Sequence, residues 1–156
     1  MWKRRERKPL DMDADHMKAL HLECSEQLEL MRTALEASES SAGTMRDNLD
    51  SMAENHWHGF LDVMHMIMLH DESFAAIMKK PGMALRTDEK SEYDERPYTV
   101  NRLLLIRLVS ALARRHQRLV HVWSLRGSPM SEYYKSSMMM EREHIVELIS
   151  LIQGMV

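Results

Sequence analysis

Apolar residues recur along the first half of the chain at steps of three and four, the period of an amphipathic helix. The pattern predicts one helix over about 13–37 and a second over about 44–80, with Thr44 as N-cap and Pro81-Gly82 as the stop. The predicted inner faces are Met17, Leu20, Cys24, Leu28, Met31 and Leu35 in the first helix, and Trp57, Phe60, Met64, Ile67, Phe74 and Met78 in the second. Strand-like alternation is absent from the sequence.

The second half begins after a polar segment, 83–96, which has no apolar period. This segment is predicted to be a loop and the first site of proteolysis. Pro97 opens a third helix that ends near Gly127, and Ser128-Pro129 opens a fourth. The predicted inner faces are Leu105, Leu108, Val109, Leu112, Leu119, Val120 and Trp123, then Tyr134, Met138, Glu141, Ile145, Leu148 and Ile152. We therefore expect an all-α bundle of four long helices over 13–156, preceded by an arm over 1–12.

Composition narrows the class of protein. A chain of 156 residues suits a single domain, and Cys24 as its only cysteine excludes an internal disulfide and a cysteine-based zinc site. The most apolar run, 103–113, is too short to cross a bilayer and contains Arg107. Since the basic start is followed by acidic residues where a secretory signal needs an apolar core, we expect a cytoplasmic protein.

Charge is distributed unevenly, although the formal net charge is only -3. Residues 1–8 carry a charge of +4, and the segment 97–131 carries +6 because it has six arginines and no acidic residue. The rest of the chain carries -13. This distribution predicts an acidic body with a basic arm and one basic helix.

The arginines of the third predicted helix form the strongest candidate site. Arg107, Arg114 and Arg118 follow at steps of seven and four, which places them in one row pointing away from Leu112 and Trp123. A row of arginines without acids is typical of a surface that binds phosphates. The residues predicted to bind nucleic acid are Arg107, Arg114, Arg115, Arg118 and Arg126, with Lys3, Arg4 and Arg5 of the arm. The alternative is that these arginines pair with acidic helices of the same bundle or of a neighbour.

A second candidate is a metal site on the second predicted helix, where Glu54, His58, Asp62 and His65 share one face. This face lies opposite Phe60 and Ile67, so we expect it to be solvated, without a metal or other cofactor. A further pair, His116 and Glu141, lies on apolar stripes. Because a buried carboxylate needs a partner, we expect these two to pair with each other or to face another chain.

Arg115 and His121 are separated by five residues, Arg115-His116-Gln117-Arg118-Leu119-Val120-His121. This spacing is similar to the signature of HEPN-type ribonucleases, small four-helix bundles in which the Arg and His of two protomers meet across a dimer and cut RNA. The resemblance implies Arg115 and His121 as the catalytic pair. The position directly after the arginine, commonly Asn in that family, is His116 here.

No phosphate-binding glycine loop, dinucleotide fingerprint, nucleophile elbow or paired-histidine protease motif is present in the sequence, which favours binding over catalysis. Sixteen methionines, among them Met138-Met139-Met140, supply adaptable apolar surface for protein contacts or self-association. We therefore expect a non-catalytic helical subunit that binds nucleic acid or an acidic partner through its third helix, within a nucleoprotein or homo-oligomeric assembly.

Overall fold

The computed structural model describes residues 14–78, 98–125 and 131–156, and all its regular elements there are helices. They are α1 (Ala14–Glu39), α2 (Gly43–His70), the short α3 (Glu72–Met78), α4 (Tyr98–Ser124) and α5 (Ser131–Gln153). The predicted all-α class and the four long helices are confirmed. None of the described helices is long and apolar enough to cross a membrane.

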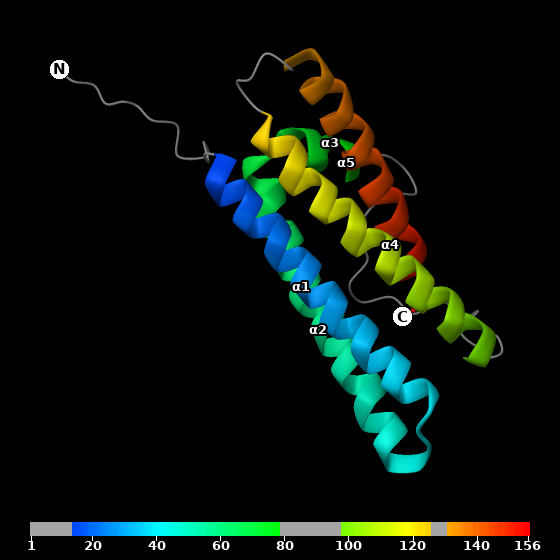
Figure 1. Ribbon diagram of the computed structural model, residues 1–156. Coiled ribbons are helices and arrows are strands. Elements are labelled where there is room, and N and C mark those ends of the chain that lie inside the picture. The colour runs from blue at the N-terminus through cyan, green and yellow to red at the C-terminus, as the bar shows by residue number, and fades with distance from the viewer. Residues whose placement is uncertain (1–13, 79–97, 126–130) are drawn as a thin grey trace.

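The four long helices form a bundle in which α1 lies between α2 and α4, and α4 lies between α1 and α5 (Figure 1). Each of these neighbours runs antiparallel to the next, so α2 and α4 run in the same direction. The short α3 lies at the end of the bundle where α4 ends and α5 begins, and it contacts both α2 and α5.

Polar contacts fix the register of α1 against α4. His21 meets His116, Ser25 accepts a hydrogen bond from Gln117 at 2.9 Å, and Ser38 accepts one from Arg102. From the His21–His116 contact to the Ser38–Arg102 contact, the residue number rises along α1 and falls along α4, which is the antiparallel order. On the other side of α1, the Gln27 side chain packs over Gly59 of α2, where an added Cβ would lie 2.9 Å from Gln27 Oε1.

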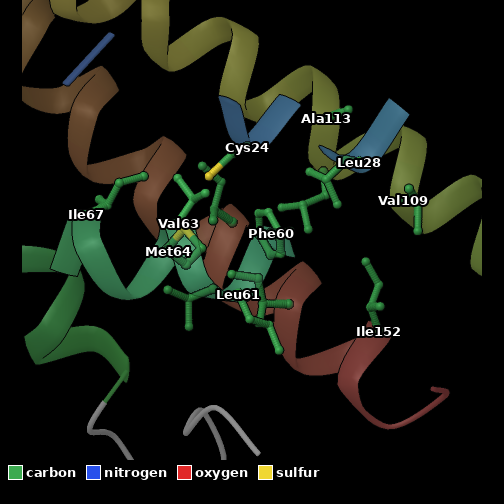
Figure 2. Close-up of a cluster of buried hydrophobic side chains, with 14 of the residues drawn as sticks. Cys24, Leu28, Phe60, Leu61, Val63, Met64, Ile67, Val109, Ala113 and Ile152 are labelled. Carbon is green, nitrogen blue, oxygen red and sulfur yellow. The ribbon is translucent and has the colours of Figure 1, made fainter. Parts of the chain in front are cut away.

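The core is apolar and draws on every described helix (Figure 2). Of the residues predicted for an inner face, all but Val120 are buried or pack against the buried core, and Val120 is half-buried. The periodicity of the sequence therefore located the buried faces correctly. Apolar residues at helical spacing lie on one face of a helix, and that face packs away from water.

Two helix boundaries differ from the prediction. The predicted second helix is broken at Asp71, whose backbone is extended and whose side chain binds the first amides of α3. Its N-cap is Ala42 instead of Thr44, and Gly43 at the start of α2 has a φ of 62°, a conformation that glycine adopts without steric cost. The predicted loop 83–96 and the helix start at Ser128-Pro129 lie outside the described residues.

Candidate functional site

The predicted arginine row lies on the outside of α4. Arg107, Arg114 and Arg118 are all exposed, and the exposed His121 continues the row. At a rise of about 1.5 Å per residue, the three arginines cover about 16 Å of helix length. Among the described residues, no ion pair joins Arg107 or Arg114 to an acid, so these two guanidinium groups face solvent.

Arg115 takes a different direction, toward α5. Its Nη1 lies 3.2 Å from both carboxylate oxygens of Glu141, whose side chain is only 5% exposed. Arg118 reaches the same carboxylate only at 3.8 Å, and its own side chain is 62% exposed. Arg115 is thus the main counter-ion of a buried glutamate, and Arg118 keeps most of its surface in solvent.

Arg102 of the same helix differs from the other arginines because it is almost fully buried. It is 2% exposed, and its Nη1 donates to Ser38 Oγ and Asp50 Oδ1 while Nη2 donates to Asp50 Oδ2 at 3.3 Å. Its Nε lies 3.6 Å from Glu39 Oε2. Of the arginines described in α4, Arg102 and Arg115 therefore serve the bundle, and the row of Arg107, Arg114 and Arg118 remains as surface.

The predicted pairing of His116 with Glu141 is wrong. His116 hydrogen-bonds to His21 of α1, with 2.9 Å between their Nδ1 atoms, and Glu141 is held by Arg115. His21 is not among the residues predicted for a site, although its position on the apolar stripe of α1, between Met17 and Cys24, indicates a buried histidine.

Both imidazoles of this pair are fully buried and are held neutral. Burial lowers the pKa of His21 to about 3, and the positive Arg142 acts in the same direction. Burial also lowers the pKa of His116 well below its ordinary value, with a smaller effect of His21. Neither Nε2 atom has a hydrogen-bond partner among the described residues.

Asp71 and Arg142 form a second buried polar contact, which no pattern in the sequence predicts. Arg142 Nε and Nη2 each lie 3.0 Å from Asp71 Oδ2, and the Arg142 guanidinium lies 5.8 Å from the centre of the Phe74 ring. The other carboxylate oxygen of Asp71 accepts from the backbone amides of Ser73 and Phe74. One carboxylate thus caps α3 and joins it to α5.

The predicted metal-binding stripe on α2 is solvated. Glu54, His58, Asp62 and His65 are all exposed, as their position opposite Phe60 and Ile67 predicts. No group of three or more His, Cys, Asp or Glu side chains suited to hold a metal ion occurs within the described ranges.

The two residues of the HEPN-like spacing point in different directions. Arg115 binds Glu141 on the α5 side, whereas His121 is exposed in the arginine row. Six residues correspond to about 120° around a helix of 3.6 residues per turn. One chain therefore does not bring Arg115 and His121 together.

The methionines divide into a core set and a surface set. Met17, Met31, Met64, Met78 and Met138 are buried, and the surface set is Met45, Met52, Met66, Met139 and Met140. Of the Met138-Met139-Met140 run, only the first faces the core. Protein contacts or self-association through the surface set stay a prediction.

The remaining predicted contacts lie outside the described residues. These are Arg126 and the three basic residues of the arm, Lys3, Arg4 and Arg5. In comparisons with known proteins, no family model, curated protein or solved structure matches this chain. The geometry of the described side chains is therefore the basis for a functional assignment.

Proposed function

We propose that the outer face of α4 binds the phosphate backbone of a nucleic acid through Arg107, Arg114 and Arg118. The observation behind this proposal is an exposed row of three guanidinium groups on a helix that has no acidic residue. Each guanidinium has several donors suited to phosphate oxygens, and displaced counterions add to the affinity.

Several acidic residues of the neighbouring helices are already paired with other arginines. This supports an external partner for the arginine row. On α1, Arg32 binds Glu29 and Glu36 at 2.6 and 2.9 Å. On α5, Glu141 is bound by Arg115. The exposed acids Glu143 and Glu147 of α5 form no ion pair with the row among the described residues. Arg118 shares Glu141 with Arg115 at 3.8 Å, and the charges of Arg107 and Arg114 stay available to a ligand.

The alignment of the three arginines along one side of α4 favours a phosphate backbone over an acidic protein. Along a straight helix, the steps from Arg107 to Arg114 and from Arg114 to Arg118 correspond to about 10 and 6 Å. A nucleic-acid strand offers a negative charge about every 3.4 Å along a duplex axis, so each arginine meets a phosphate without a matched sequence. We therefore expect affinity without strong base specificity.

The test is the salt dependence of binding to labelled DNA and RNA oligonucleotides. Replacing Arg107, Arg114 and Arg118 together by Ala should weaken binding to all sequences alike. The log-log salt slope should fall by up to about 0.9 for each lost contact on duplex DNA, or about 0.7 on single strands. Replacing the same three residues by Lys should preserve most of the slope, because the charge is retained.

The control is Lys135→Ala, which removes an exposed cation from α5 outside the row and should have little effect. If the wild type binds neither DNA nor RNA at low salt, the proposal is rejected. If polyglutamate binds as tightly as the oligonucleotides and loses affinity in the same triple variant, the partner is an acidic protein instead.

A further inference from the structure

The His21–His116 contact is an unusual connection between α1 and α4 because both partners are titratable and fully buried. The ring centres are 5.1 Å apart. Phe60 of α2 lies edge-on to His116 with 5.4 Å between ring centres, and Phe74 of α3 lies 6.1 Å from His21. The pair is therefore enclosed by aromatic rings, without water-exposed surface.

The hydrogen bond between the two imidazoles makes it unfavourable to add a proton to either ring. A hydrogen bond between two Nδ1 atoms requires one imidazole to carry its proton on Nδ1 and the other to carry it on Nε2. A first added proton must enter the vacant Nε2 of the donor ring, which has no acceptor beside it. A second must enter the accepting Nδ1, which would place two N–H groups head to head across 2.9 Å.

The charged groups around the pair do not compensate for a positive imidazole. From α5, Arg142 acts on His21 as a like charge, and it is already bound to Asp71 at the junction of α2 and α3. Glu141, also on α5, is bound by Arg115 of α4. On α1 itself, Cys24 is a buried thiol whose pKa is raised by burial and then by Glu23, so it brings no negative charge.

We propose that the His21–His116 pair is an acid-triggered latch: it holds α1 against α4 when both rings are neutral, and it opens when the two rings take up protons. Opening must separate the helices, because neither ring has solvent access in the closed bundle. The latch is independent of what the arginine row binds.

The direction of the pH effect follows from the difference between the folded and unfolded chains. In the unfolded chain both imidazoles titrate near 6.5, whereas the pKa of His21 in the bundle is about 3 and that of His116 is also lowered. Below pH 6.5 the unfolded chain therefore binds more protons, and acid favours opening until the folded pKa values are reached. Well above pH 6.5 both imidazoles are neutral in the folded and the unfolded chain, so the pair does not make the free energy of unfolding depend on pH.

Chemical denaturation of the full chain at about pH 7.5 and about pH 5.5 tests the latch. Each histidine that takes up its proton only after opening should raise the unfolding equilibrium constant about tenfold as the pH falls from about 7.5 to about 5.5. The two together should raise it by about 100-fold. Replacing His21 and His116 together by Leu should remove most of this rise. Replacing the exposed His58 and His65 together by Gln is the matched control and should retain it.

A measurement on the wild type covers the case in which the double Leu variant does not fold. Nitrogen-15 NMR of the imidazoles at about pH 5.5 should show two neutral rings of opposite tautomer in the folded protein. Ordinary titration of this pair near 6.5 within the folded state would overturn the latch. The same conclusion follows if the folded Leu variant keeps the full pH dependence.

Discussion

Arg102 and Arg107 are only five residues apart on α4 and have the same side chain, yet they play different roles. Arg102 is buried with Ser38 and Asp50, whereas Arg107 lies on the outer face. Because five residues correspond to about 140° around the helix, the two guanidinium groups point to different surroundings. The energetic consequence of losing an arginine therefore depends on its position around α4.

The first prediction compares these two arginines. Arg102→Ala should destabilise the protein by about 3 kcal/mol, since it leaves the partly buried Asp50 without its main counter-ion. Arg107→Ala should change the free energy of unfolding by less than about 0.5 kcal/mol. Urea denaturation of both variants measures the difference, and equal effects would show that the Asp50 contact contributes little.

At the scale of elements, the important feature is the interruption between α2 and α3. The apolar period continues through Phe74 and Met78, so the sequence predicted one long helix. Asp71 breaks this helix because its carboxylate accepts from the amides of Ser73 and Phe74 and also binds Arg142. The break turns α3 so that it contacts α5 as well as α2.

The second prediction separates the two roles of Asp71. Asp71→Asn retains an oxygen that can cap α3 but loses the charge opposite Arg142, and should cost about 3 kcal/mol. Asp71→Ala loses the cap as well and should cost about 1 kcal/mol more. Thermal and urea unfolding give both values. The neighbouring exposed acid provides the control, Glu72→Ala, which should have a small effect.

At the scale of the whole molecule, α1 is the helix around which the bundle is organised. It contacts α2 on one side and α4 on the other. Its polar contacts with α4 occur near both ends of the seam, at His21–His116 and at Ser38–Arg102. The arginine row occupies the outer side of α4, away from this seam, so its exposure is compatible with a fully formed core.

The third prediction concerns the HEPN-like spacing. Because Arg115 is bound to Glu141 and His121 is exposed on another side of α4, the purified protein should leave single-stranded RNA uncut. Incubation with labelled RNA, with and without a metal chelator, measures this. Metal-independent cleavage that disappears in His121→Ala would contradict the prediction. In that case the active site would have to combine His121 of one protomer with Arg115 of a second protomer.

Helical periodicity was enough to predict the four long helices and their buried faces, because it is a local property that a stripe such as Met17, Cys24 and Leu28 displays. It also placed Arg107, Arg114 and Arg118 on one exposed side for the same reason. Which polar groups meet depends instead on how the helices pack together. His21 and His116 are 95 residues apart, and Asp71 and Arg142 are 71 apart. No local pattern encodes such pairings, since they depend on the order and register in which the helices pack.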